Sequence, residues 1–341
     1  MLNIISDFIK SILPSKRKAT PTGWISFNAP CCHHNGESPD TRGRGGLTAN
    51  QDGSVSYHCF NCGFKASYQP GRHLTFKFRK LLAWLGASDS DVKRLVIEAI
   101  RVRELVAPEE VKLEEEEKIE FKVRDLPEDV LSFKTLYTYH ILDDGKNVPD
   151  QLLAAMRYVA DRKINLKKYD FLWTASLEHK LNQRVIIPMI WEGKTIGYTS
   201  RAFVDDVKPK YYSSYEPNFV FNTNNQRPES KFVIVCEGPF DAMAVDGVAV
   251  LGNEVSDVQA DIIDSLGREV VVVADADRAG AKLIQKAIEY GWSASFPVWQ
   301  ETCKDINEAV VKYGKLFVLK SILDAKETSK LKIELKRKKL S

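Results

Sequence analysis

Apolar positions change their spacing several times along the first third of the chain. Residues 4–13 carry apolar side chains at helical spacing, which predicts a short amphipathic N-terminal helix. Residues 21–70 are instead rich in Gly, Pro, Asn, Cys and His, a composition typical of short strands and turns. Helical spacing returns over 74–104. The pattern therefore predicts a small β-rich region with helical segments on both sides of it.

The second half of the chain shows strand and helix patterns in alternation. Helical patterns cover about 127–142 and 150–164, and two strand patterns, Arg184–Trp191 and Thr195–Phe203, form a predicted hairpin through Glu192-Gly193-Lys194. From residue 231 onward, apolar strands alternate with helices, which indicates a parallel sheet with covered faces and an α/β fold, α+β overall. The predicted strands of this sheet are 232–236, 248–251, 270–274 and 294–298, and the predicted helices are 239–246, 256–266 and 278–290.

These changes of pattern divide the chain into seven predicted segments. The clearest boundary is the run of glutamates around 114–117, which we interpret as an acidic linker. The segments are an N-terminal helix (1–20), a metal-binding domain (21–73), a helical segment (74–104), the linker (105–122), the first part of the core (123–230), the parallel-sheet subdomain (231–325) and a basic C-terminal tail (326–341).

Charge is distributed unevenly over these segments. The chain of 341 residues has a net charge of +3 and is 44% hydrophobic. Residues 1–104 carry 15 Lys and Arg against 8 Asp and Glu, and residues 326–341 carry 7 against 2. This asymmetry suggests a polyanionic partner such as nucleic acid. No apolar run approaches the roughly 18 residues that span a bilayer, and Asp7 interrupts the N-terminal apolar stretch, so we expect no membrane segment, no secretory signal and a cytoplasmic protein.

Four of the six cysteines cluster with histidines in residues 31–62. Cys31 and His34 form one pair with two residues between them, and Cys59 and Cys62 form a second pair followed by Gly63. Two such pairs supply the four tetrahedral ligands of one structural Zn²⁺ and indicate a zinc ribbon. The first pair stays ambiguous, because Cys32 and His33 lie beside it, and His58 is a further candidate ligand.

Basic and aromatic residues surround the predicted zinc site. Together they would stack on bases and bind phosphates, as single-stranded nucleic acid requires. The alternative for each ring is packing around the metal. The residues are Arg42, Arg44, Lys65 and Arg72, with Tyr57, Phe60, Phe64 and Tyr68.

Carboxylates follow two strands of the predicted parallel sheet. Glu237 comes directly after the first strand, Asp275 and Asp277 come after the third, and Asp305 belongs to a later candidate segment. Sites in open parallel sheets lie at the carboxyl ends of the strands, where these groups would repel one another without bound cations. Oxygen ligands suit Mg²⁺ or Mn²⁺, and a pair of such ions serves in-line displacement at phosphorus. The alternative is that the acids are helix N-caps, since Asp241 and Asp277 lie near helix starts.

These motifs, taken together, resemble those of the DnaG-type primases, and most closely those of T4-like bacteriophages. Tyr57 to Gly63 is similar to the family's second zinc knuckle, and Cys31-x-x-His34-Asn35 to its first, with Cys32 where a proline is usual. Val235 to Gly238 with Asp241, and Asp275 to Gly280, resemble its TOPRIM motifs. The third motif, usually Lys-Asp-Pro-Asp, reads here Lys304-Asp305-Ile306-Asn307, so Asn307 replaces a carboxylate.

The resemblance implies a zinc domain followed by a primase core with a TOPRIM subdomain. It puts Glu237 in the position of the general catalyst and Asp275 and Asp277 in metal positions, with two Mg²⁺ or Mn²⁺ ions expected and Asp305 as a further ligand. Arg184, Arg201 and Lys210 match basic residues that bind template and nucleoside triphosphate in relatives. The implied activity is synthesis of short RNA primers from ribonucleoside triphosphates on a single-stranded DNA template, beside a hexameric replicative helicase. The N-terminal helix and the basic tail are candidate docking or DNA-contacting segments.

Two other classes of protein compete with this interpretation. A recombination mediator resembling RecR also combines zinc with TOPRIM but binds DNA without catalysis, and the Arg184–Lys210 region argues against it. Another TOPRIM enzyme would be a topoisomerase, for which the chain has little room, or a nuclease that degrades DNA without ribonucleotides. A zinc-ribbon protein with a degenerate core is a third alternative, against which Glu237, Asp275 and Asp277 argue.

Overall fold

The computed structural model describes the chain in two compact units. Unit 1 comprises residues 1–118 and 260–268, and unit 2 comprises 119–259 and 269–341. The described residues are 2–21, 23–72, 74–105, 119–136, 148–227, 229–275, 280–299 and 303–339. Most of the predicted acidic linker, 106–118, lies outside them. Among the described helices, none combines the length and the apolar character needed to cross a membrane.

Unit 1 is built on a five-stranded antiparallel sheet with the strands in sequence order. Alternate residues of β4 face the core, so that Val55, Tyr57 and Cys59 are buried while Ser56 and His58 are half-buried on the other face. The elements are α1 (Ile4–Ser11), β1 (Arg17–Ala19), β2 (Ile25–Phe27), the 3₁₀ turn η1 (Cys32–Asn35), β3 (Gly45–Ala49), β4 (Val55–Cys59), β5 (Lys65–Tyr68), α2 (Phe76–Trp84) and α3 (Asp89–Leu105).

The N-terminal helix is part of the core of unit 1. Ile5 and Ile9 are fully buried in the same apolar cluster as Leu47 of β3 and Leu82 of α2. The amphipathic pattern correctly predicted this helix, but its apolar face is already covered within the unit. Ile5 and Ile9 are thus used within the unit, and the role of α1 as a docking or DNA-contacting segment stays a prediction that its exposed residues would have to fulfil.

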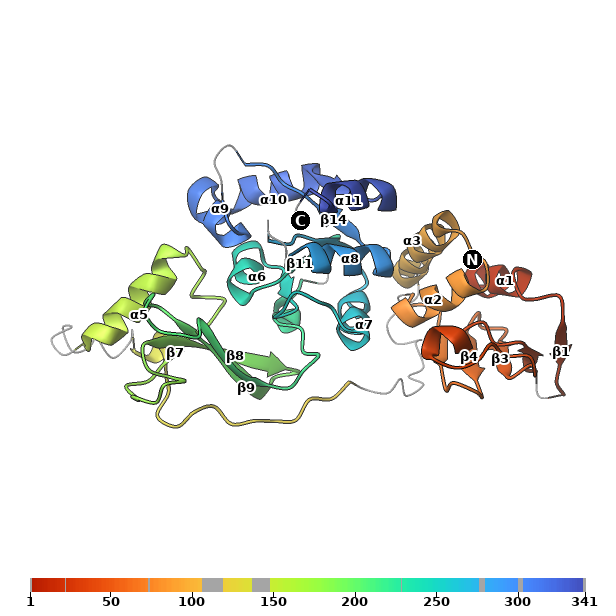
Figure 1. Ribbon diagram of the computed structural model, residues 1–341, viewed down its shortest axis with the longest axis horizontal. Coiled ribbons are helices and arrows are strands. Elements are labelled where there is room, and N and C mark those ends of the chain that lie inside the picture. Colours follow the sequence, from red (N-terminus) through yellow and green to blue (C-terminus); the bar gives the residue numbers. More distant parts are fainter. Residues whose placement is uncertain are drawn as a thin grey trace. The chain divides into compact units, whose positions relative to one another are not determined.

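The first part of unit 2 is a second antiparallel sheet, in the order β10-β9-β8-β7-β6. Its longest strands, β8 and β9, form the green hairpin of Figure 1. Glu192 and Gly193 join them with φ of 47° and 77°, the two positive values that a two-residue hairpin turn requires. The elements are β6 (Leu131–Ser132), α5 (Asp150–Asp161), β7 (Leu172–Trp173), β8 (Arg184–Trp191), β9 (Lys194–Ala202), β10 (Tyr211–Tyr215) and the 3₁₀ turn η3 (Thr223–Asn225).

The second part of unit 2 is a mixed sheet in the order β12-β11-β13-β14-β15. The four strands β12, β11, β13 and β14 pair in parallel, and β15 is added antiparallel at the edge. The elements are β11 (Phe232–Cys236), α6 (Pro239–Val245), β12 (Val248–Ala249), β13 (Glu269–Val272), α8 (Gly280–Tyr290), β14 (Ser293–Ser295), α9 (Ile306–Tyr313), α10 (Lys315–Asp324), β15 (Lys326–Glu327) and α11 (Lys330–Arg337). Between β12 and β13 the chain forms α7 (Asp257–Ser265), of which residues 260–265 belong to unit 1.

Two sequence predictions differ from the structure. The helix predicted over 127–142 is replaced at 131–132 by strand β6, with helix only at 133–136 and residues 137–147 outside the described part. The predicted C-terminal tail is ordered as β15 and α11, in which Ile333 is 1% exposed and Lys336 pairs with Glu327 at 2.7 Å. Ile333, the buried residue of α11, was a weak apolar signal among the lysines of this segment.

Candidate functional site

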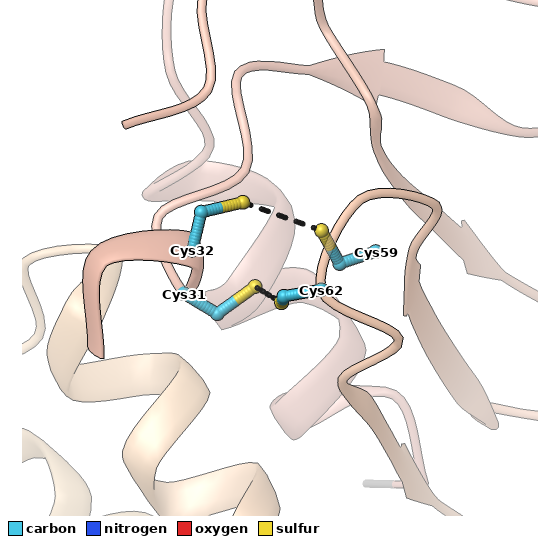
Figure 2. Close-up of side chains that lie close together, drawn as sticks. All are labelled: Cys31, Cys32, Cys59 and Cys62. Atoms are coloured by element: carbon cyan, nitrogen blue, oxygen red, sulfur yellow. Dashed lines mark hydrogen bonds between the residues drawn. The ribbon is translucent and has the colours of Figure 1, made fainter. Parts of the chain in front are cut away.

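Four cysteine sulfurs gather in unit 1. Cys31 and Cys32 come from the start of η1, and Cys59 and Cys62 come from the turn after β4 (Figure 2). The Sγ atoms of Cys31 and Cys62 are 3.5 Å apart, as are those of Cys32 and Cys59. All four lie within 4.8 Å of one another.

Local backbone geometry creates this arrangement. At the second knuckle, the N–H of Gly63 donates to the carbonyl of Cys59 at 3.0 Å, and Gly63 has a φ of 73°. That conformation is accessible to glycine at little cost. In the first knuckle, the left-handed Gly36 ends η1 after a single turn. Each pair of cysteines is thus fixed by a tight turn that closes on glycine.

The predicted ligand His34 lies outside the cluster, and Cys32 occupies the fourth position. The His34 ring stacks on Trp84 of α2, with centroids 4.6 Å apart and planes 8° from parallel. The x-x spacing suggested Cys31 with His34, whereas the 3₁₀ turn brings the adjacent Cys31 and Cys32 to the metal position and directs residue 34 toward α2. His58 is also outside the cluster, with its ring 4.3 Å from that of Phe60.

The four sulfurs fit one zinc ion. A tetrahedral ion with Zn–S bonds of about 2.3 Å separates its sulfurs by about 3.8 Å, close to the spacing found here. Cys31, Cys32 and Cys59 are buried, and burial raises the pKa of the Cys31 and Cys32 thiols. A bound cation is what would stabilise them as thiolates. The donor set leaves no open position, so the site is structural and its ion would hold the two knuckles together.

Side-chain donors surround the sulfurs. The amide nitrogen of Asn61 donates to Cys32 Sγ at 3.4 Å, and that of Asn35 donates to Cys62 Sγ at the same distance. Each knuckle therefore supplies an amide to a sulfur of the other knuckle. Outer hydrogen bonds of this kind orient metal ligands and tune their basicity.

Asn61 is itself held by an ion pair between the half-buried Arg44 and the buried Asp40. Its carbonyl oxygen accepts from Arg44, whose Nε donates to Asp40 at 2.9 Å. Burial alone would raise the pKa of Asp40, but the N–H groups of Ala29, Arg42 and Arg44 and the Arg44 side chain lower it to about 2. The predicted DNA-contacting Arg44 thus supports the metal site.

Only one of the four rings expected to stack on bases is well exposed. Phe60 is 68% exposed, whereas Tyr57 and Tyr68 are each 2% exposed in the core. Phe64 packs edge-on against Trp84, with centroids 5.0 Å apart. For these three rings the alternative, packing in the core around the cysteines, is the one found.

A cavity of about 370 Å³ in unit 2 contains most of the remaining predicted residues. Glu237 and Asp275 lie there, just beyond the carboxyl ends of the adjacent parallel strands β11 and β13. The backbone N–H of Asp275 donates to Glu237 Oε1 at 3.1 Å. Gly280 lets α8 begin against them, because a Cβ there would lie 2.2 Å from the Asp275 carbonyl oxygen.

Two further carboxylates line the same cavity. Asp241 belongs to α6, and Asp305 caps α9, where its side chain accepts from the N–H of Glu308 at 2.7 Å. Burial first, and then the negative charges of Asp305 and Asp275, raise the pKa of Asp241 to about 8. The cavity therefore concentrates negative charge that a cation would relieve. Asp277 lies outside the described residues.

These carboxylates are more widely spaced than the cysteines. Within the described ranges, the four cysteines are the one group of metal-ligand side chains that gathers within 4.8 Å. Asn307, in the position of the usual acid of the motif, directs its side chain to Arg162, while its backbone N–H donates to Asp241 Oδ1 at 2.9 Å. The Oδ1 atom of Asn307 accepts from Arg162 at 2.8 Å and the Nδ2 atom donates to the Arg162 carbonyl at 3.0 Å.

The three predicted basic residues lie in different surroundings. Arg201 lines the cavity, with Nε donating to Tyr158 at 2.9 Å and its guanidinium 4.6 Å from the Tyr211 ring centroid. Lys210 is exposed and is not among the lining residues.

Arg184 is fully buried and does not reach the cavity. Its guanidinium donates to the carbonyls of His179, Pro209 and Lys210, at 3.3, 2.6 and 3.2 Å. The expectation that Arg184 contacts nucleotide was wrong for this structure, because its donors are used to hold the segment between β9 and β10. The strand pattern could not reveal that a charged residue points inward.

Arg162 is a lining residue that the sequence analysis missed. Its guanidinium lies 4.6 Å from the ring centroids of both Tyr158 and Phe240, and it borders the cavity. A basic residue four positions after a tyrosine on a helix was the available signal, but such a pair is common on solvated surfaces.

One protein family matches the part of the chain that forms much of this cavity. Residues 234–310 match the model of the Toprim-like family. This range contains Glu237, Asp241, Asp275 and Asp305, and it coincides with the parallel strands β11, β12, β13 and β14. Residues 234–310, most of which belong to unit 2, are therefore similar to the Toprim-like family, as the resemblance of the motifs predicted.

Part of the chain is also similar to two bacterial DNA primases. It is 28% identical over 152 residues to the DNA primase of Aquifex aeolicus, and this match covers 39% of this chain and 30% of that protein. It is 29% identical over 158 residues to the DNA primase of Clostridium acetobutylicum, which covers 40% of this chain and 26% of that protein. The matches thus span less than a third of each relative. The zinc-binding and RNA polymerase domains of the Aquifex aeolicus primase align with 95% of this chain and 83% of that structure, at 19% identity and a TM-score of 0.44.

Proposed function

We propose that this protein is a DNA primase that synthesises short RNA primers on single-stranded DNA. The observation that carries the proposal is the cavity at the carboxyl ends of β11 and β13, where the carboxylates of a Toprim-like domain lie beside arginines. The DNA primases to which the chain is similar support it. Within the primases, the motifs favour the kind found in T4-like bacteriophages, which would act in the cytoplasm of the host.

The carboxylates of the cavity are suited to hold divalent cations. Glu237, Asp275 and Asp305 offer oxygen ligands, to which the sequence adds Asp277. Two Mg²⁺ ions, when bound, would activate the attacking 3′-hydroxyl and stabilise the charge that develops at the α-phosphorus. Asn307, bonded to Arg162, would instead set the position of that arginine.

The arginines of the cavity are suited to bind the triphosphate. Arg162 and Arg201 are the two cationic side chains among the described residues that line the cavity. Arg162 is oriented by the rings of Tyr158 and Phe240, and Arg201 by the ring of Tyr211, so little conformational freedom is lost when phosphate oxygens bind. Lys210, which is exposed and does not line the cavity, is assigned to the template or the triphosphate, and Arg184 keeps the backbone of Lys210 in place.

Unit 1 is suited to contact the template through the outer face of its sheet. Strand pairing places Lys18, Ser26, Gly46, His58 and Lys65 in one row across the five strands. Two lysines at the ends of the row and the exposed ring of Phe60 beside His58 supply charge for phosphates and a surface on which bases stack. The zinc ion would maintain this face, and a hexameric replicative helicase is the expected partner.

A de novo priming assay tests the proposal. Mixed-sequence single-stranded DNA, four ribonucleoside triphosphates with one labelled, and Mg²⁺ are incubated with the full chain, with Asp275→Ala and with Asp150→Ala. Asp150 is an exposed acid of α5 that lines neither described cavity, so its variant is the matched control. We expect short RNA from the wild type and the control, and at least about 100-fold less from Asp275→Ala.

Other outcomes of the assay would favour a competing class of protein or a different cation site. Labelled RNA absent even after a helicase is added, with DNA binding that needs no Mg²⁺, would overturn the proposal in favour of a recombination mediator. Mg²⁺-dependent degradation of the DNA strand without ribonucleotide incorporation would indicate a nuclease. Asp275→Ala that primes like the wild type would show that the catalytic cations are held elsewhere.

A further inference from the structure

A second cavity lies at the other end of α6. The N-terminal end of this helix, Gly238 to Asp241, borders the first cavity, and its last residues, Val245 and Asp246, border a cavity of about 320 Å³. A helix of seven residues spans about 10 Å. The two cavities are therefore separated by the length of about three stacked nucleotides.

The second cavity combines an apolar floor with a basic rim. Ile234, Val245 and Leu319 contribute apolar surface. Four cations line it against a single carboxylate, Asp246; they are Lys168, Arg227, Lys231 and Lys315. Apolar surface beside clustered cations is complementary to a nucleotide, whose base and sugar are largely uncharged while its phosphate is anionic.

Two of these cations are held in place from within the protein. Asp246 has a left-handed conformation with φ of 53° at the end of α6, and its carboxylate pairs with Lys168 at 2.9 Å and with Lys315 at 2.5 Å. The hydroxyl of Tyr169 donates to the same carboxylate at 2.9 Å. Both ammonium groups are thus positioned before any ligand arrives, which lowers the entropy lost on binding.

The other two cations are exposed, and Glu229, which lies between them in the sequence, is not paired with either in the described part of the chain. Arg227 and Lys231 form no ion pair with any residue in the described part of the chain. Unpaired cations beside a pre-positioned pair leave a net positive rim, and this is the feature that attracts an anion.

A basic segment links the two cavities. Residues 162–168 contain four cations and no carboxylate; Arg162 borders the first cavity, and Lys168 borders the second. Lys163 and Lys167, between them, are exposed. Cations that continue from one cavity to the other extend farther than one free nucleotide, so the distribution favours an extended strand as the occupant.

We propose that the second cavity is a phosphate-binding subsite for a single nucleic-acid strand that continues from the first cavity along residues 162–168. One nucleotide of the strand lies against the apolar floor, and its phosphates contact Arg227, Lys231, Lys168 and Lys315. The identity of the strand, template or new primer, rests on the proposed function, whereas the subsite itself rests on the geometry.

Charge reversal on the rim tests this subsite. The full chain carrying Arg227→Glu and Lys231→Glu is compared with a chain carrying Lys122→Glu and Lys194→Glu, which are exposed lysines of unit 2 that line neither cavity. Affinity for labelled single-stranded DNA of twelve nucleotides is measured by fluorescence anisotropy without Mg²⁺ over a range of salt. We expect at least about tenfold weaker binding for the rim variant alone, and a salt slope shallower by about 1.4, because about 0.7 is lost per phosphate on a single strand.

Binding of a dinucleotide and of free ATP distinguishes an extended strand from a mononucleotide as the occupant of the second cavity. A dinucleotide, too short to extend beyond the first cavity, should bind the wild type and the rim variant equally. Equal losses in the rim and control variants, or no loss in either, would overturn the subsite. A rim variant that loses affinity for ATP but keeps its affinity for DNA would identify a mononucleotide site and overturn the strand as occupant.

The binding experiment and the priming assay distinguish failure of the subsite from failure of the primase proposal. If the wild type binds DNA through the rim as expected but makes no RNA, the primase proposal fails while the subsite holds. If the wild type primes and the rim variant binds DNA normally, the subsite fails while the primase proposal holds.

Discussion

A sulfur atom in the cysteine cluster is positioned by two kinds of neighbour. Cys32 lies 3.5 Å from Cys59 across the cluster and receives the amide of Asn61 from outside. Although Cys31 and Cys32 are adjacent, the chain turns into η1 between them, and their side chains face Cys62 and Cys59 separately. His34, two positions later, is used in a stack with Trp84. At the scale of single residues, the structure therefore assigns the metal to sulfur alone.

Zinc content measures this assignment directly. Replacement of Cys32→Ser removes one of four sulfur ligands, so we expect the purified chain to contain well below one zinc per molecule. Replacement of His34→Ala removes a ring that stacks on α2 and should leave one zinc per chain. Metal analysis of both variants after dialysis is the measurement, and zinc lost from His34→Ala but kept in Cys32→Ser would reverse the assignment.

At the scale of elements, the β8–β9 hairpin and the segment that follows it depend on one buried charge. Arg184 begins β8, and its guanidinium satisfies three carbonyls, two of them in the segment that leads to β10. Burial lowers the pKa of Arg184, and the nearby positive charge of Arg201 adds to this. The free-energy cost of burying this charge is offset by the three hydrogen bonds, which hold the backbone beside the cavity. There Arg201 and Tyr211 pair across β9 and β10.

Loss of this guanidinium should lower stability. Replacement of Arg184→Met removes the guanidinium from the part-buried carbonyl oxygens of His179 and Pro209, and we expect the free energy of unfolding to fall by about 2 to 4 kcal/mol. The control, Lys210→Met, alters an exposed lysine and should change it by less than about 0.5 kcal/mol. Urea unfolding followed by circular dichroism gives both values. Equal stability of the two variants would show that Arg184 is not structural.

At the scale of the whole molecule, the sequence predicted elements better than orientations. The strands 184–191 and 232–236 were predicted to the residue, because apolar runs between turn residues have few other solutions. The sequence also predicted that Glu237 and Asp275 lie at one edge of a parallel sheet, since adjacent parallel strands have their carboxyl ends at the same edge. It failed where a side chain has two possible directions: Arg184 points inward, Tyr57 and Tyr68 face the core, and Ile333 of α11 is buried. Pattern alone does not distinguish a basic residue that binds a ligand from one that satisfies carbonyls.

The two units differ in what stabilises them, and this leads to the last prediction. Unit 2 has a large apolar cluster of its own, which includes Val185, Val271 and Val318. The apolar cluster of unit 1 includes three of the four cysteines themselves, so part of its core is organised by the metal. Removal of zinc should therefore loosen unit 1 while unit 2 keeps its structure.

Hydrogen exchange of the full chain locates this effect. After zinc is removed with a chelator under reducing conditions, we expect amide exchange in β3 and β4 to accelerate at least about tenfold, because four sulfurs without a cation no longer tie the knuckles together. Exchange in β8, β9 and β11 should stay within about twofold of its value in the zinc-loaded chain. Restored protection on addition of Zn²⁺ serves as the control for irreversible damage. Uniform acceleration in all five strands would mean that both units depend on the metal, and unchanged exchange in β3 and β4 would mean that the sheet of unit 1 is stable without it.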